Sequence, residues 1–451
     1  MSSPRFAILA TAFLLASSLS SVAQAQSAVP PPSPLSVQAG KVTVRFGGFV
    51  DATSVTRSTT TGTGIGTSFG TIPVNGPSTR DLSETRLTAQ NTRLSLLATG
   101  QSGRTSMQGF VEVDFLGTAA GNLQITSNSN TPRMRHAWAQ ASVGRVDVVV
   151  GQSWGLLTPG RSGISPSSAN VFFTQLMDIN FQAGLVWTRA AQFRVVVRPS
   201  DRVAVAIALE NPQQYVGSAV KLPNGFPASQ VNTGGNGATP NPVPDLVGKV
   251  AIDVPVGALR QHVEVAGVVR RFRTSDPMAS DSSTATGRGG AVNVNLELRK
   301  GFRLIGNTYF SSGGGRYIAN TNIPDFIIDG NRRIALVSSR SVMGGVEWSA
   351  GAKTSVFGYA SQARATRSLA MDPATSESIG FGVAGHSAAN RTIKEMSVGV
   401  NHSFFKDPAI GTLQLIAQYS HLTRTPFSVA SGSSTRGTAR MFFFDIRYIL
   451  P

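Results

Sequence analysis

Apolar and polar residues alternate with a period of two in one segment after another, from Lys41 to the end of the chain. Successive side chains of a β-strand point to opposite faces of the sheet, so this period predicts strands with one apolar and one polar or small face. Beyond the N-terminal region, no stretch approaches the ~18 consecutive apolar residues that a membrane-spanning helix needs. The alternation is clearest for Val42, Val44 and Phe46 against Thr43, Arg45 and Gly47, for Met134 and Trp138 against Arg133, Arg135 and Ala137, and for Phe193, Val195 and Val197 against Arg194 and Arg198.

About sixteen such segments follow one another, and short connections alternate with long loops rich in Gly, Ser, Thr and Asn. The segments start near residues 41, 86, 105, 132, 145, 185, 202, 244, 259, 288, 302, 340, 354, 391, 411 and 437, and the long loops include 58–85, 154–184, 213–243, 312–339, 365–390 and 424–436. Transmembrane barrels have short turns on the periplasmic side and long loops outside. We therefore predict an all-β fold, a transmembrane antiparallel up-and-down β-barrel of about sixteen strands.

A soluble β-sandwich is the structural alternative, because its strands also alternate with a period of two. Sandwich strands are usually about five or six residues long, whereas the segments here run to about ten. The number of segments is also high for one soluble sheet. Both observations favour the barrel.

The first residues predict export. Arg5 is followed by an apolar stretch, 6–15, and then by small residues that end in Ala23-Gln24-Ala25, the pattern of a cleaved signal peptide. An uncleaved anchor is the alternative, but the apolar stretch is too short to cross ~30 Å of hydrocarbon. We expect the protein to be located in a bacterial outer membrane. The chain should have three parts, a signal peptide at 1–25, a proline-rich periplasmic leader at 26–40 and the barrel at 41–451.

The composition narrows the partners. The chain has no cysteine, which removes disulfides, thiolate metal sites and cysteine nucleophiles together. Its formal net charge of +17 predicts anionic partners, and for an exported protein these are small anionic solutes and the phosphates of outer-membrane lipid and lipopolysaccharide. Nucleic acid is the usual partner of so basic a chain, but the export signal argues against it. We expect no cofactor and no metal.

Six short segments together resemble the DcaP-like family of outer-membrane porins. They are NTRLS (91–95), GFVEVDF (109–115), RMRHAW (133–138), VGQSW (150–154), RAAQFR (189–194) and ALENP (208–212). The resemblance covers roughly a third of the chain, and none of these segments is catalytic. It implies a homotrimer of sixteen-stranded barrels whose third external loop folds into the lumen, and a channel for small solutes with a preference for organic anions such as dicarboxylates.

Arginines recur on the polar faces of the predicted strands, at Arg93, Arg133, Arg135, Arg189, Arg194 and Arg198. A charge facing lipid near the midplane costs ~2 to 4 kcal/mol, so these side chains are expected to face the lumen. Guanidinium groups bind carboxylates in a bidentate fork, which suits a row of weak anion sites. The alternative is structural: Glu112 and Asp114 precede Arg133 and Arg135 by one strand, and opposite charges on neighbouring strands stabilise a sheet.

The connection from Trp154 to Gly184 is the candidate for a loop that narrows the pore. It contains glycine and proline hinges, two charged residues, Arg161 and Asp178, and an apolar patch at 171–173 and 176–177 that could pack against the inner wall. The alternative is an ordinary surface loop, since long external loops are common in barrels. We predict that Arg161 lies across the water path from the arginines of the wall.

Two other functions remain in view. An enzymatic barrel would need one of the five histidines beside an oriented nucleophile, and no segment shows such a motif, so we expect no catalytic residue. A structural or adhesive barrel without an open pore fits the Ser/Thr/Asn-rich loops as well as a porin does. Single-channel conductance separates these two.

Overall fold

The computed structural model describes residues 34–74, 77–117, 124, 128–167, 176–177, 181–234, 239–276 and 282–451. The predicted signal peptide, 1–25, and the first part of the predicted leader, 26–33, lie outside the described residues. Among the residues that are described, no helix is long and apolar enough to cross a membrane.

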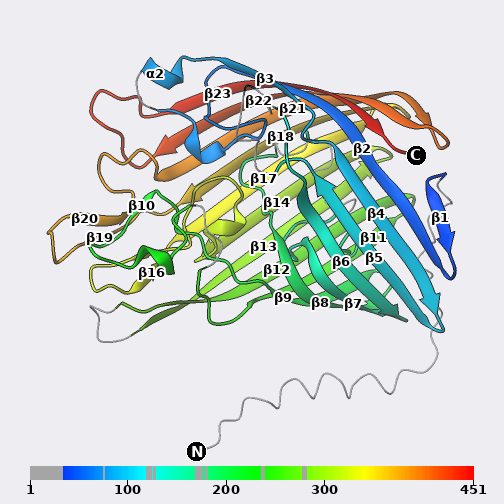
Figure 1. The fold of residues 1–451 in the computed structure, drawn as a ribbon, viewed down its shortest axis with the longest axis horizontal. Helices are drawn as coiled ribbons and strands as arrows, with labels where there is room; N and C mark the ends of the chain where they lie inside the picture. The colour runs from blue at the N-terminus through cyan, green and yellow to red at the C-terminus, as the bar shows by residue number, and fades with distance from the viewer. Residues whose placement is uncertain are drawn as a thin grey trace, which may run out of the picture. The chain divides into compact units, whose positions relative to one another are not determined.

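Sixteen antiparallel strands of the described chain form one closed barrel (Figure 1), which confirms the predicted fold. Each strand pairs with its neighbours in chain order, and the last one closes the barrel when Met441–Ile449 pairs with Phe49–Arg57 of the first. The strands are β2 (Val42–Arg57), β4 (Arg93–Ser102), β5 (Thr105–Asp114), β6 (Arg133–Val143), β7 (Val146–Trp154), β8 (Arg189–Ser200), β9 (Val203–Glu210), β11 (Asp245–Val256), β12 (Leu259–Thr274), β13 (Ser283–Arg299), β14 (Phe302–Ser312), β17 (Ser338–Ser349), β18 (Thr354–Ala365), β21 (Asn390–Asp407), β22 (Gly411–Pro426) and β23 (Gly437–Ile449).

Two short strands complete the edges of β2. Strand β1 (Ser36–Ala39) pairs with the beginning of β2, on the same edge that pairs with β23 further along the strand. Strand β3 (Glu84–Thr88) pairs with the end of β2 on the edge that β4 occupies at its beginning. The sequence pattern did not predict β1, which lies within the segment that we interpreted as the leader, 26–40.

The two faces of the wall differ as the alternation predicted. On β5, Val111 is 48% exposed on the outside of the barrel, whereas its neighbour Glu112 faces inward and is 5% exposed. Trp138 is a correction. The pairing of β5 with β6 shifts after Glu112, so Arg135 is an extra residue in the strand and the faces exchange beyond it. Trp138 therefore faces inward at 7% exposure, although Met134 faces outward at 52%.

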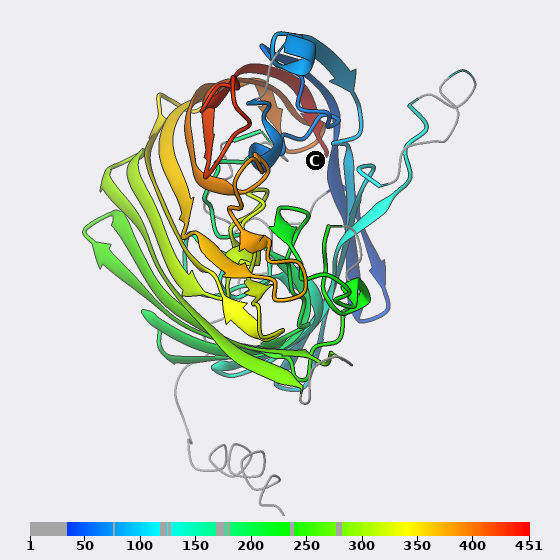
Figure 2. The same ribbon diagram turned by 90° about the vertical axis from the view of Figure 1, so that its left-hand side faces the viewer.

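The long loops lie at one end of the barrel, and four of them have side chains buried inside it. They are L3 (155–188), L4 (211–244), L6 (313–337) and L7 (366–389). In Figure 2 the green segment of L4, the yellow segment of L6 and the orange segment of L7 lie inside the ring of strands. The smaller elements of the loops are α2 (Pro77–Arg80), η1 (Phe69–Thr71), β10 (Val220–Lys221), η3 (Ala228–Gln230), η4 (Gly315–Tyr317), β15 (Phe326–Ile328), β16 (Ile334–Leu336), β19 (Ser368–Met371) and β20 (Ser378–Phe381).

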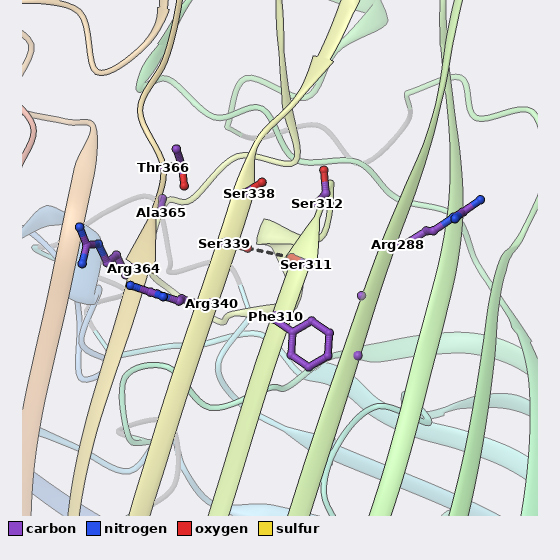
Figure 3. Close-up of a pocket in the computed structure, with 12 residues that line it drawn as sticks. Arg288, Phe310, Ser311, Ser312, Ser338, Ser339, Arg340, Arg364, Ala365 and Thr366 are labelled. Atoms are coloured by element: carbon purple, nitrogen blue, oxygen red, sulfur yellow. Dashed lines mark hydrogen bonds between the residues drawn. The ribbon is translucent and has the colours of Figure 1, made fainter.

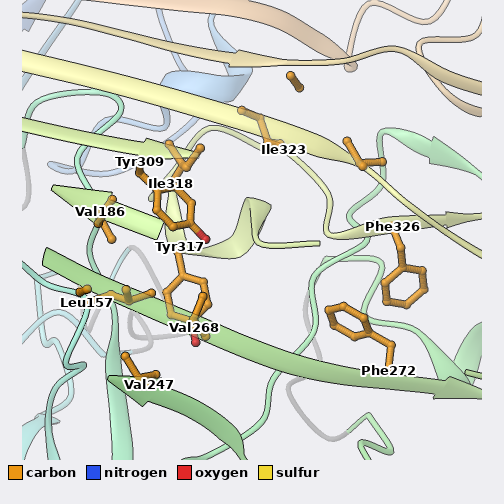
Figure 4. Packing of buried hydrophobic residues seen from close by; sticks show 14 of the residues in the cluster. Leu157, Val186, Val247, Val268, Phe272, Tyr309, Tyr317, Ile318, Ile323 and Phe326 are labelled. Carbon is orange, nitrogen blue, oxygen red and sulfur yellow. The ribbon is translucent and has the colours of Figure 1, made fainter. Parts of the chain in front are cut away.

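Side chains of these loops form a hydrophobic core with the inner wall of β8–β14, shown in Figure 4. L4 and L7 are joined by a three-stranded sheet in which β20 lies between β10 and β19. Tyr317 and Phe326 of L6 are completely buried in this core. We call this region, β8–β14 with L4, L6 and L7, the packed half of the barrel.

Candidate functional site

Loop L3 crosses the lumen, as predicted, and is fastened there by its own backbone. Five of its N–H groups donate hydrogen bonds to inward-facing side chains of five different strands. These bonds join Leu156 to Glu210 (2.6 Å), Gly160 to Glu264 (3.1 Å), Gly163 to Asp253 (2.8 Å), Met177 to Gln418 (2.8 Å) and Ala183 to Glu395 (2.7 Å). A backbone N–H bonded to a buried carboxylate is a strong, directional contact, so the loop has a fixed path.

The predicted apolar patch of L3 is described only in part. Leu176 and Met177 are buried, and Met177 packs with Ile393 and Ile416 of the wall formed by β21 and β22. Residues 171–173 and Asp178 lie outside the described residues. The described part therefore packs against the inner wall, as the sequence indicated.

Arg161 of L3 is bound to the wall at β17, and its position across the water path from the other arginines remains a prediction. Its two terminal nitrogens lie 3.0 and 2.8 Å from the carboxylate oxygens of Glu347 on β17, and Tyr359 donates to the same carboxylate at 2.8 Å. The sequence could not show this contact because Glu347 is distant in the chain. The pair anchors L3 to the far wall.

Four of the predicted arginines do come together, on β4, β6 and the start of β8. Arg133 binds Asp114 through two bonds of 3.0 and 2.7 Å. Arg135 bridges both acids, with Glu112 at 2.8 Å and Asp114 at 2.9 Å, and Arg93 approaches Glu112 at 3.7 Å. We call Arg93, Arg133, Arg135 and Arg189, with Glu112 and Asp114, the arginine cluster.

Cross-strand pairing and exposure to the lumen thus occur together in the arginine cluster. Arg133 is paired, but 37% of its side chain is exposed. Arg135 is paired and almost completely buried. Four guanidinium groups face two carboxylates, so the cluster keeps a formal charge of +2.

The ring of Trp154 links Arg189 to this cluster. The guanidinium of Arg135 lies 5.8 Å from the ring centre and that of Arg189 lies 5.4 Å from it. The ring of Trp187 packs against the same ring, with centres 3.9 Å apart and planes tilted by 38°. Cations are attracted to the electron-rich face of indole, so Trp154 stabilises both guanidinium groups near its ring.

Arg189 also lines a cavity of about 350 Å³ between the end of L3, L4 and L6. Arg189 and Arg316 are the charged residues of its described lining, and the other polar groups are amides and hydroxyls. Arg316 donates to the backbone oxygen of Gln213, which keeps its guanidinium at the boundary of L4 and L6. We call this the entry cavity.

The other two predicted arginines lie apart from the cluster. Arg194 is 2% exposed beneath L3, where it donates to the backbone oxygen of Trp154 (2.7 Å) and to Gln192 (2.9 Å). Arg198 lies near the short turn after β8 and pairs with Asp147 at 2.5 Å. Among the described residues, no group of three His, Asp or Glu side chains is arranged to hold a metal ion.

Solved structures of outer-membrane channels are similar to this chain, including the following two. The outer membrane channel DcaP of Acinetobacter baumannii matches with a TM-score of 0.66 and 15% identity, over 92% of this chain and 99% of that one. The anion-selective porin from Comamonas acidovorans matches with a TM-score of 0.51 and 12% identity, over 91% and 100%. The chain has the fold of an outer-membrane porin. No protein-family model matches the sequence, and no curated protein matches it.

Part of the lining of the entry cavity was not predicted from the sequence. Arg316 of the entry cavity was not predicted, because it lies in a loop whose sequence has no period that fixes where side chains point. The amide groups of Gln213 and Asn232 in L4 were missed for the same reason. Their proximity to Arg189 comes from the folding of L4 and L6 into the barrel mouth.

Proposed function

We propose that this protein is an outer-membrane channel through which small organic anions, such as dicarboxylates, diffuse. The observation that carries the proposal is the entry cavity, whose described lining holds two guanidinium groups and no carboxylate. Its volume of about 350 Å³ is at the lower end of the range for small-molecule sites. The guanidinium fork fits a carboxylate group in two parallel hydrogen bonds.

The arginine cluster forms the next stage of the proposed path. A permeating anion that leaves Arg189 meets Arg133, whose exposed guanidinium is already half neutralised by Asp114. A partly neutralised site attracts an anion without trapping it, which conduction requires. Arg93 and Arg135 maintain the positive field from the wall, and L3 narrows the water path on the opposite side.

The remaining features of the proposal come from the sequence. The resemblance to the DcaP-like family supports membership of that family and assembly as a homotrimer. The signal pattern at 1–25 supports export and cleavage after Ala25, and the net charge of +17 supports contact with lipopolysaccharide. Arg133 and Arg189 are the proposed anion-contacting residues, with Arg316 added, while Arg93 and Arg135 supply positive field from the wall. Arg161, Arg194 and Arg198 support L3 and the wall.

Reversal potentials in a salt gradient test the proposal. R189Q/R316Q removes both charges of the entry cavity, and we expect the ratio of anion to cation permeability to fall by up to about fivefold for each charge. Succinate should also block the chloride current of the variant less than that of the wild type. The matched control is R271Q/R273Q, which removes two charges from the outer face of β12. Equal selectivity of the two variants would contradict the proposal.

A barrel without an open pore is the second candidate, and the packed half favours it. L4, L6 and L7 fill much of the mouth with buried side chains. Such a barrel would be silent in a planar bilayer, whereas the proposed channel conducts. Single-channel recording of the wild type therefore decides between them before any variant is made.

A further inference from the structure

Three arginines stand on the outer face of the barrel, away from the lumen. Arg288 of β13, Arg340 of β17 and Arg364 of β18 are all exposed, and they line a groove of about 600 Å³. Their chain neighbours Ser339, Ser341, Ala363 and Ala365 are buried and face inward, which places the arginines on the opposite, outward face. Figure 3 shows Arg340 and Arg364 on neighbouring strands, with Phe310 between Arg340 and the strand of Arg288.

Two of these arginines are in direct cross-strand register. Arg340 pairs with Arg364 in the ladder of β17 and β18, so both side chains leave the same face of the sheet at adjacent positions. Like charges directly opposite each other destabilise an antiparallel pair. Among the described residues, no carboxylate lines the groove or forms an ion pair with any of the three. An anion between the guanidinium groups would relieve this repulsion.

The position of the groove indicates which anion it meets. Arg340 is the third residue of β17 and Arg364 the last but one of β18, both at the end of the barrel that carries the long loops. Further along the same face of β17 come exposed Val342, Val346 and Trp348, the apolar surface that faces hydrocarbon. The arginines therefore stand just above the hydrocarbon, at the level of the lipid headgroups.

The floor of the groove has an apolar part. Phe310 is 62% exposed and lies beside Gly290, where a Cβ atom would come within 2.9 Å of the phenyl ring. Glycine at this position thus lets the ring lie close to β13. Phe310 is in register with Arg340, so a ligand in the groove meets guanidinium groups and a phenyl surface side by side, which fits a molecule with phosphate groups next to an acyl chain.

We infer that this groove binds a phosphorylated glycolipid of the outer leaflet, the lipid A part of lipopolysaccharide, with a phosphate between Arg340 and Arg364. Arg288 contacts the same headgroup from the other side of Phe310, and the ring contacts the acyl chain. A free phosphate would use only the charges. The lipid uses the charges and the apolar floor, and it is held at the right depth by the membrane.

The test uses the full chain, purified in detergent and free of lipopolysaccharide, with binding measured by native mass spectrometry. The probes are diphosphoryl lipid A, monophosphoryl lipid A and inorganic phosphate. R288Q/R340Q/R364Q is expected to weaken binding of diphosphoryl lipid A by about a hundredfold, at about fivefold for each arginine near an anionic headgroup. The control R104Q/R202Q/R260Q, at the opposite end of the barrel, should bind like the wild type.

Other arms of the test separate the sources of the anion. Monophosphoryl lipid A should bind more weakly than the diphosphoryl form, and excess inorganic phosphate should not displace the lipid. Displacement by inorganic phosphate would overturn the lipid assignment. Unchanged lipid A binding by the triple variant would also overturn it, and if the variant then lost its oligomeric state, the groove would be a contact with a second copy of the chain.

A charge reversal gives a second, independent check. R364E places a carboxylate opposite Arg340, so it should raise the unfolding temperature in lipid-free detergent while it lowers lipid A binding. A lower unfolding temperature in a folded barrel would show that the two arginines do not repel each other. The single-channel conductance of these variants should equal that of the wild type, because the groove lies outside the lumen. Failure of the lipid-binding inference can therefore be told apart from failure of the proposed channel.

Discussion

The two sides of this barrel use arginine differently. In the packed half, Arg270 of β12 is 1% exposed and is enclosed by Asp245 at 3.0 Å, Asp325 at 2.8 Å and the backbone oxygen of Gly313. In the arginine cluster, four guanidinium groups share two carboxylates and part of their surface remains open. Full enclosure fixes a loop in place, whereas incomplete pairing leaves positive charge available to a solute.

The largest effect is expected where enclosure is complete. R270Q leaves Asp245 and Asp325 buried without their counter-charge, which costs about 3 to 5 kcal/mol in similar cases. Asp325 and Tyr317 both belong to L6, and they bind Arg270 and Asp245 of the wall. Loss of Arg270 should therefore detach L6 from the wall. Trypsin should cleave the variant after Arg332 or Arg333, and the unfolding temperature should fall.

R271Q is the matched control for this prediction. Arg271 is the next residue of β12, faces outward and bonds only to threonine hydroxyls in the described structure. The R271Q variant should resist trypsin as the wild type does. If R270Q were equally resistant, the buried charges would not hold L6, and the contrast between the two sides would fail.

A smaller effect is expected at the anchor of L3. The pair of Arg161 and Glu347 is mostly buried, with 16% and 6% of the side chains exposed, so loss of one partner should cost about 2 kcal/mol. R161Q and E347Q should each loosen L3 and raise the single-channel conductance with more current noise. The exchanged pair R161E/E347R should restore part of the wild-type behaviour. Identical current traces for both single variants and the wild type would remove L3 from the pore-narrowing role.

The strands were predictable because their signal is local. A period of two is read within one segment, and the predicted starts at 105, 259, 302, 354, 411 and 437 coincide with the observed ones. The bulge at Arg135 was not predictable, since an extra residue leaves no trace in the period until the partner strand is known. Strand β1 was also missed.

The candidate site was predictable in its residue types and not in its arrangement. Alternation correctly placed Arg133 and Arg135 on the inner face, and the nearby acids indicated their pairing. Contacts between distant segments carry no local pattern. Three contacts could therefore not be predicted from the sequence. They are the pair of Arg161 and Glu347, the burial of Arg194 under L3 and the proximity of Arg316 to Arg189.

The smallest change in stability should come with the sharpest difference in function. Arg133 with Asp114 and Arg198 with Asp147 are matched pairs, because the two arginine side chains are 37% and 35% exposed and both acids are buried. R133Q should lower the free energy of unfolding by no more than about 1 kcal/mol, because Arg135 still neutralises Asp114. R198Q leaves Asp147 buried without its counter-charge and should cost about 1 to 3 kcal/mol. Only R133Q removes charge from the arginine cluster. It should shift the reversal potential towards cations, while R198Q, near the short turn, should leave it unchanged. Equal shifts would mean that selectivity follows the total charge of the lumen and that the cluster has no special role.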